Sequence, residues 1–378
     1  MKIGRIQRIV GAAATAAAVC SGAARLDAQT SVKPKTVTTA KPPATTSTTT
    51  RTQAAPAKPA PTPQAAAKPA QTRSSLAKSR AAAADRARRA AVARAAALER
   101  ERIEAMTPHY RRDLQGNQIP DVRAAAAIVF DPQTNNVLWE QNAHEVRSIA
   151  SLTKLMTALT FVADEPDLNQ VVVVTSADMR NASTTYLKTG DRLSYRDLLH
   201  LALIPSDNAA ARVLARTSEG GTAAFITRMN EMAANLGLTN SSYADPSGLD
   251  ARNVSSAYDI SHLIAFTSAD ATLGPIMRTQ EYTVRTIANR VIPIHSTNKL
   301  LLDGTPLGTG MDVVAGKTGF ISKSGYCLAT LLQVPAGPRF AVVVLGAASS
   351  TIRFWEARHL FNWVVGRSAG LIGGLEIQ

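Results

Sequence analysis

The sequence predicts an α/β fold in which one sheet is built from both ends of residues 123–366 and the segment between them is helical. Short apolar or alternating runs lie near the beginning and the end of this stretch, whereas the intervening runs follow helical spacing. Strands at both ends with helices between them favour a single sheet covered by helices. Residues 124–378 are also long enough to bury a core.

Charge and aromatic residues divide the chain into two parts. Residues 1–123 hold 22 basic and 7 acidic residues, whereas residues 124–378 hold 20 and 21, and the first aromatic residue is Tyr110. The net charge of +14 therefore belongs to a segment that cannot form an ordinary core. This distribution argues against nucleic acid as a partner, because such binding needs basic residues on a folded surface.

The first 28 residues are predicted to be a secretory signal peptide. Three basic residues precede an uncharged run from Ile9 to Ala24, and small residues follow it. The run is short for a membrane span, although an uncleaved anchor stays an alternative. We expect export across the inner membrane to the periplasm or cell envelope.

Two further segments precede the folded part. Residues 29–73 contain eight prolines among Thr, Ala, Gln and Lys, which predicts a disordered linker. Residues 74–112 are rich in Ala and Arg and are expected to form a basic helix. This helix is either a solvated surface element or an arm attracted to anionic envelope surfaces.

The first half of the folded part begins with two strands. We expect them at Ala124–Asp131 and Val137–Gln141, joined by a turn that contains Asn135 and Asn136. A helix is expected from near Ser151 to Thr160, and a β-branched run predicts a short strand at Val171–Val174.

Helices dominate the middle, and strands return near the end. The expected helices are Tyr195–Leu203, Ala209–Arg216 after the break at Pro205, Thr222–Leu236, and Ala257–Thr267 with a Ser256/Asp259 capping box. The expected closing elements are strands at Asp312–Ala315, Tyr326–Gln333 and Phe340–Leu345, a helix at Thr351–Val365, and a C-terminal tail over 367–378.

Three short motifs carry chemistry in a meaningful order: Ser151-Leu-Thr-Lys154, Ser206-Asp207-Asn208 and Lys317-Thr318-Gly319. At the first turn of a helix, positions i and i+3 share a face, so Lys154 can reach the Ser151 hydroxyl. Burial and a nearby cation, which Lys317 could supply, would leave the lysine uncharged and able to activate the serine. The helix N-terminus adds positive potential where an oxyanion develops.

Copies of each motif occur elsewhere, so order and context matter. Ser75–Lys78 is a second SxxK pattern, Lys188–Gly190 is a second Lys-Thr-Gly, and Ser296–Asn298 matches Ser-Asp-Asn only as an SxN pattern. No metal-binding HExxH or CxxC motif occurs, and the six histidines show no ligand spacing. The two cysteines, Cys20 and Cys327, also exclude a cysteine-rich zinc site, so we expect neither a metal nor another cofactor.

Four stretches resemble the low-molecular-mass penicillin-binding proteins of the D-alanyl-D-alanine peptidase family. They are SIASLTKLMTAL, LLHLALIPSDNAAARVLA, YADPSGLDARNVSSAYDI and VVAGKTGFISKSGYCLA. The resemblance runs from about Arg123 to about Val365. It implies a DD-peptidase/β-lactamase-like antiparallel sheet flanked by helices, with a helical subdomain and a site between the two.

The resemblance also implies catalytic roles. Ser151 would be the acylated nucleophile and Lys154 its base. Ser206 and Asn208 would relay protons and hold the substrate.

The remaining implied site residues bind substrate. Lys317 and Thr318, with Gly319 completing their motif, would hold its carboxylate, and the amides of Ser151 and Phe320 would form the oxyanion hole. Arg353, within TIRFWE, resembles a family arginine that helps to bind the terminal carboxylate.

The expected activity is serine-type D-Ala-D-Ala peptidase action on peptidoglycan stem peptides, with β-lactams as covalent inhibitors. Because 59 residues follow Gly319, the chain resembles the shorter endopeptidase branch, but carboxypeptidase and endopeptidase both stay open. The alternatives are a β-lactamase-type hydrolase and a non-catalytic wall-binding protein. Glu165–Asn169 spells the ExxLN of class A β-lactamases, but it precedes Ser206 and is expected to be a surface turn.

Overall fold

The computed structural model describes residues 73–302, 312–334 and 337–373. The chain divides into two units, Ala17–Glu99 and a larger one that includes Arg100–Gln378. The expected signal peptide lies outside the described residues, as does the expected linker apart from Arg73. Within the described residues, no helix combines the length and apolarity that a membrane span requires.

Helix α2, Arg73–Ala105, contains the Ala/Arg-rich segment. Its described side chains are exposed, and the Arg89–Asp85 ion pair of 2.9 Å is of the i,i+4 type that stabilises solvated helices. The helix ends seven residues before the expected boundary at 112. Pro108 disfavours helical geometry at Thr107, and Tyr110–Arg112 forms strand β1 instead.

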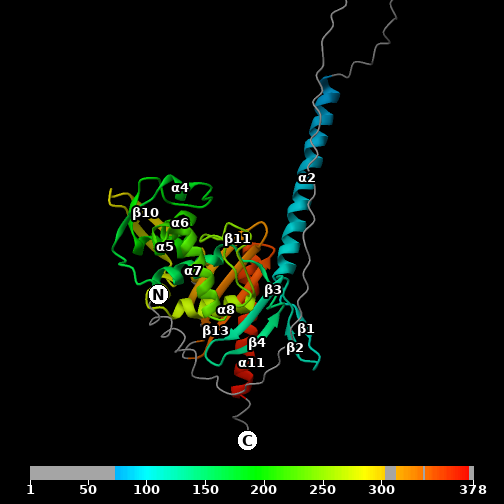
Figure 1. Ribbon diagram of the computed structural model, residues 1–378. Coiled ribbons are helices and arrows are strands. Elements are labelled where there is room, and N and C mark those ends of the chain that lie inside the picture. Colours follow the sequence, from blue (N-terminus) through cyan, green and yellow to red (C-terminus); the bar gives the residue numbers. More distant parts are fainter. Residues whose placement is uncertain (1–72, 303–311, 335–336, 374–378) are drawn as a thin grey trace, which may run out of the picture. The chain divides into compact units, whose positions relative to one another are not determined.

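The expected antiparallel sheet is confirmed. Its five strands run in the order β11-β12-β13-β3-β4, so both ends of the folded part contribute (Figure 1). The strands are β3 (Ala126–Asp131), β4 (Asn136–Gln141), β11 (Asp312–Ile321), β12 (Gly325–Gln333) and β13 (Arg339–Ala347).

Helices cover both faces of this sheet. Ile128 and Val343, paired across β3 and β13, face the core that includes α8 (Ala257–Ala269). Their neighbours Val129 and Val344 face the opposite core, formed with α11 (Ser350–Gly373). Coverage on both faces explains why the central strands are continuously apolar rather than alternating. Helix α11 also continues to Gly373 through much of the expected C-terminal tail.

The helical region lies between strands β4 and β11. Its longer helices are α3 (Thr153–Ala163), α5 (Tyr195–Leu203), α6 (Asn208–Thr217) and α7 (Gly221–Asn235). The shorter elements are η1 (Ala150–Leu152), α4 (Ser176–Met179), α9 (Leu273–Met277) and α10 (Lys299–Leu302). Helix α3 is buried from Thr153 to Val162, which suits its largely apolar composition.

Four two-stranded sheets complete the described part of the fold. They pair β1 with β2 (Gln118–Pro120), β5 (Arg147–Ser148) with β8 (Val254–Ser255), β6 (Val171–Val173) with β7 (Arg192–Ser194), and β9 (Glu281–Arg285) with β10 (Val291–His295). The β9–β10 hairpin was not predicted from the sequence.

Candidate active site

Ser151 lies in η1, directly before the buried helix α3. Ala150 has a φ of 48°, a left-handed conformation that is uncommon for a residue with a side chain. Strain of this kind persists where the surrounding structure holds it, and it concentrates at functional sites. No side chain caps the N-terminus of α3, so its positive potential is directed toward Ser151.

Lys154 lies one turn further along α3 and contacts the predicted nucleophile. Its Nζ lies 3.0 Å from the Ser151 hydroxyl and 2.6 Å from both Asn208 Oδ1 and the Ser247 carbonyl oxygen. The Lys154 side chain is fully buried, whereas Ser151 is partly exposed. The structure therefore joins a buried amine to a hydroxyl that solvent can reach.

Burial lowers the pKa of Lys154 to about 7. The charges of Asp207 and Asp245 oppose this change, and the charge of Arg212 adds to it. Burial is thus the main cause, and the cation with the smaller effect is Arg212, not Lys317 as the sequence suggested. A lysine with this pKa is partly uncharged at neutral pH, as a general base requires.

A second lysine contacts a second serine. Lys317 Nζ donates to Ser206 Oγ at 2.7 Å and to the Thr318 carbonyl oxygen at 2.9 Å. Burial, together with the charge of Lys154, holds the pKa of Lys317 well below its usual value. Ser206 has a φ of 66°, so both predicted active serines lie at or beside a left-handed residue.

The turn that carries Ser206 is held by the residue after it. Asp207 is the N-cap of α6, and its carboxylate accepts hydrogen bonds from the Ala210 amide and from Tyr186 N and Thr185 Oγ1. These bonds place Asn208 at the first position of α6, where its amide group reaches Lys154. The Ser-Asp-Asn motif therefore contributes one structural side chain between two site residues.

Strand β11 contains the third motif. The strand was expected to end at Ala315, but it continues to Ile321 because residues 316–321 pair with β12. Gly319 is required here, since a Cβ would lie 2.9 Å from the Ile149 carbonyl oxygen and 3.1 Å from the Ser151 amide nitrogen. The strand thereby lies directly beside the Ser151 amide, one of the two predicted oxyanion donors.

The residues next to Gly319 differ in exposure. Thr318 is buried and donates from Oγ1 to Thr297 Oγ1 at 2.7 Å. Phe320 is 49% exposed and stacks on Tyr326, with ring centroids 4.2 Å apart. Thr297 belongs to the second SxN pattern, Ser296–Asn298, so that sequence lies beside the site although its own serine and asparagine are not part of the lysine contacts.

Arg353 is the predicted residue whose placement differs from its expected role. It is 7% exposed, and its Nη1 donates to the carbonyl oxygens of Gly319 at 3.0 Å and Cys327 at 3.2 Å. The guanidinium is thus engaged with the backbone of β11 and β12 rather than open to a substrate carboxylate. Burial lowers the pKa of Arg353 to about 10.

The β-lactamase-like Glu165 lies beyond the C-terminal end of α3, in an exposed turn. The 11 residues of α3, which span about 16 Å, lie between Glu165 and Ser151. Glu165 is therefore too far away to activate a water molecule at an acyl group on Ser151.

The Ser247 carbonyl is a site group that was not predicted from the sequence. Ser247 lies in the loop between α7 and β8, and its contact with Lys154 is made by the backbone. The stretch YADPSGLD contributed to the family resemblance, but a backbone acceptor has no residue-specific signal.

Comparisons with known proteins agree with this geometry. Residues 113–349 match a family described as D-alanyl-D-alanine carboxypeptidase. A D-alanyl-D-alanine endopeptidase of Pseudomonas aeruginosa is 33% identical over 248 residues, 65% of this chain and 78% of that protein. The D-alanyl-D-alanine carboxypeptidase DacD of Escherichia coli is 33% identical over 260 residues, 65% and 64% of the two chains. The crystal structure of the Streptomyces K15 DD-transpeptidase superposes with a TM-score of 0.60 at 26% identity, covering 65% of this chain and 97% of that one.

Proposed function

Because the chain belongs to the D-alanyl-D-alanine carboxypeptidase family and is a serine-type DD-peptidase, we propose that it cleaves peptidoglycan stem peptides through an acyl-enzyme on Ser151. The observation that carries the proposal is the 3.0 Å contact between the Ser151 hydroxyl and a buried lysine whose pKa is about 7. Ordinary surface serines lack such a base, and an unassisted hydroxyl is a weak nucleophile.

The uncharged form of Lys154 has two N–H groups and one lone pair. Asn208 Oδ1 and the Ser247 carbonyl oxygen can only accept hydrogen bonds, so they take the two N–H groups. The lone pair is then left for the third neighbour, the Ser151 hydroxyl. This arrangement directs the base at the proton that it must remove.

Acylation follows from this geometry. Ser151 Oγ attacks the carbonyl carbon of the D-alanyl residue while its proton passes to Lys154 Nζ. The Ser151 amide, directly before α3, stabilises the oxyanion, and a well-placed donor of this kind is worth about 10²–10³ in rate. The C–N bond then breaks, the leaving amine takes up a proton, and an ester on Ser151 is left for water to hydrolyse.

In this proposal, Ser206 and Lys317 assist departure of the leaving group. The Ser206 hydroxyl, held by Lys317 at 2.7 Å, can pass a proton to the leaving nitrogen. Lys317 and Thr318 lie in a strand beside Ser151, where an extended peptide and its terminal carboxylate can lie along the backbone.

Carboxypeptidase and endopeptidase activity share this acyl step and differ only in the leaving amine. We therefore propose that the chain accepts either D-alanine or a crosslinked side-chain amine as the leaving group. Purified pentapeptide monomers and crosslinked dimers should be digested side by side and the products weighed by mass spectrometry. Release of D-alanine or of monomers by the wild type, but not by Ser151→Ala, is expected. No product from either substrate would contradict the proposed function.

We propose in addition that the protein acts in the cell envelope and that the basic segment before residue 100 helps to retain it there. The described part of α2 carries exposed arginines, which favour binding to anionic surfaces. Deleting residues 29–99 should weaken salt-sensitive binding to isolated envelopes without changing penicillin acylation. Equal retention of both forms at all salt concentrations would exclude this role.

A further inference from the structure

The Ser247 carbonyl is one of the two acceptors that orient Lys154, yet it belongs to a loop without regular structure. The loop spans residues 243–253, between α7 and β8. A base must be held within a few tenths of an ångström of its working geometry, and loops seldom provide this without supporting contacts. Something must therefore fix the direction of this carbonyl.

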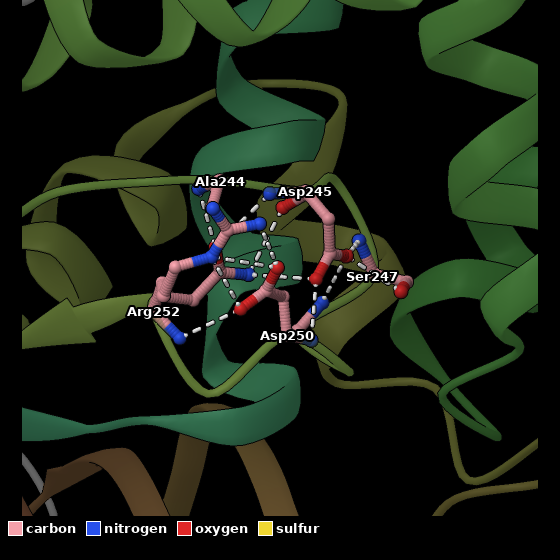
Figure 2. Close-up of polar contacts among 7 residues, drawn as sticks. Ala244, Asp245, Ser247, Asp250 and Arg252 are labelled. Atoms are coloured by element: carbon pink, nitrogen blue, oxygen red, sulfur yellow. Dashed lines mark hydrogen bonds and ion pairs between the residues drawn. The ribbon is translucent and has the colours of Figure 1, made fainter. Parts of the chain in front are cut away.

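The carboxylate of Asp245 gathers the donors of this loop. Its Oδ1 accepts from the Ser247 amide, from Ser247 Oγ at 2.6 Å and from the Gly248 amide at 2.8 Å. Its Oδ2 accepts from the Asp250 amide at 2.6 Å. Figure 2 shows the Asp245 carboxylate at the centre of these contacts. Hydrogen bonds to an ionised acceptor are roughly twice as strong as neutral ones.

Contacts with the predicted nucleophile and helix α3 fix the loop from the other side. Thr157, nearly one turn after Lys154 on α3, donates to the Pro246 carbonyl oxygen at 2.7 Å. Gly248 has a φ of 84°, and a Cβ at that position would lie 2.1 Å from the Ala150 carbonyl oxygen. Residues 246–248 therefore pack against both ends of the Ser151–Lys154 motif.

We propose that Asp245 is a positioning residue for acylation: it holds the Ser247 carbonyl in place, and that carbonyl aims the lone pair of Lys154 at Ser151. The inference rests on the proposed function, because it requires Lys154 to be the base. Asp245 itself does not touch Ser151, and it acts through the peptide of Ser247.

Asp245 has a second, separable effect on the same amine. Its charge raises the pKa of Lys154, opposing the effect of burial. Removing that charge should shift the rise of acylation rate to lower pH, because the amine loses its proton more readily. The same substitution should displace the Ser247 carbonyl and lower the plateau rate of acylation, even though a larger fraction of Lys154 is uncharged at a given pH. The midpoint thus reports the loss of the Asp245 charge, and the plateau rate reports the position of the Ser247 carbonyl.

The test compares Asp245→Asn with a matched control in the same loop, Asp250→Asn, both in the full-length protein. In the Asp245→Asn variant, the new side-chain amide retains one oxygen but turns an NH₂ group toward donors that need an acceptor. Among the described side chains, only Arg252 contacts the Asp250 carboxylate. Asp250→Asn therefore removes one negative charge from the loop, as Asp245→Asn does.

The rate of labelling by fluorescent penicillin should be measured from pH 5 to pH 9, with the unfolding temperature as a check on folding. For Asp245→Asn we expect a plateau about 10-fold lower and a midpoint at lower pH, since small misplacements of a reacting group cost up to about 10²-fold. For Asp250→Asn we expect a plateau within about twofold of the wild type and an unchanged midpoint.

A folded Asp245→Asn protein with the plateau and midpoint of the wild type would overturn the inference. If that variant does not fold, Ser247→Ala removes one donor from Asp245 Oδ1 and should lower the plateau about threefold; an unchanged plateau would equally overturn it. Absence of labelling in the wild type, or labelling that survives in Ser151→Ala, would instead contradict the proposed function.

Discussion

The candidate active site contains two lysine–serine pairs, which differ at the helix that follows each serine. Lys154 and Lys317 are both buried, and each contacts a serine hydroxyl, at 3.0 and 2.7 Å. Each serine also precedes a helix. The pairs differ in what occupies the helix N-terminus: no side chain caps α3, whereas the Asp207 carboxylate caps α6.

This difference supports the roles proposed for the two serines. The positive potential of α3 is available to a developing oxyanion beside Ser151. At α6 the carboxylate of Asp207 already interacts with the positive helix N-terminus. An oxyanion beside Ser206 would therefore be stabilised little by that helix. A lysine next to a serine is therefore insufficient, and the uncapped helix that follows Ser151 supports its proposed role as the nucleophile.

The largest effect on penicillin labelling should come from removing the hydroxyl groups of Ser151 and Ser206 one at a time. Ser151→Ala should remove covalent penicillin labelling entirely, because no other oxygen can form the ester. Ser206→Ala should still be labelled, about 10²–10⁴-fold more slowly, since it removes only proton transfer. Labelling measured by gel fluorescence and confirmed by peptide mass spectrometry distinguishes them. A Ser151→Ala protein labelled on Ser206 would reverse the assignment.

A smaller effect is expected when the second amine is replaced by an apolar chain of similar length. Lys317→Met should lower kcat/KM for pentapeptide by roughly 30- to 1,000-fold, corresponding to about 2–4 kcal/mol for a lost buried charge contact. Steady-state kinetics across pH provides the test. An unchanged KM and an unchanged kcat would show that Lys317 does not bind the substrate.

The smallest effect on chemistry is expected at Arg353. Arg353→Met leaves the carbonyl oxygens of Gly319 and Cys327 without this donor, which should cost about 2 kcal/mol of unfolding free energy. In a domain of this size that corresponds to a fall of roughly 4–8 °C in Tm. Acylation per folded molecule should change less than stability does. A normal Tm with a large increase in KM would instead support the carboxylate-binding role implied by the sequence.

Most regular elements could be predicted because they follow simple patterns. The boundaries of α5 match the prediction, and the strands near both ends form the expected sheet. The extension of β11 through Lys317 was missed because two glycines interrupt its apolar run, and both are needed for close approaches of other groups.

The contacts of the site were predictable only where they depend on spacing along one helix. Ser151 and Lys154 are three residues apart, so their meeting follows from helical geometry. The Ser247 carbonyl comes from a loop 93 residues beyond Lys154, and no local pattern in the sequence indicates it. The buried bonds of Arg353 likewise depend on how α11 packs against the sheet.

The pH dependence of acylation tests the central claim most directly, since that claim is an uncharged Lys154 acting as the base for Ser151. Burial lowers its pKa to about 7, so the second-order rate of penicillin labelling should rise with pH, reach half its maximum near pH 7 and then level off. Lys154→Met should lack this rise and react about 10²–10⁴-fold more slowly. A midpoint near the ordinary lysine value of about 10.4, or the same rise in Lys154→Met, would contradict the account.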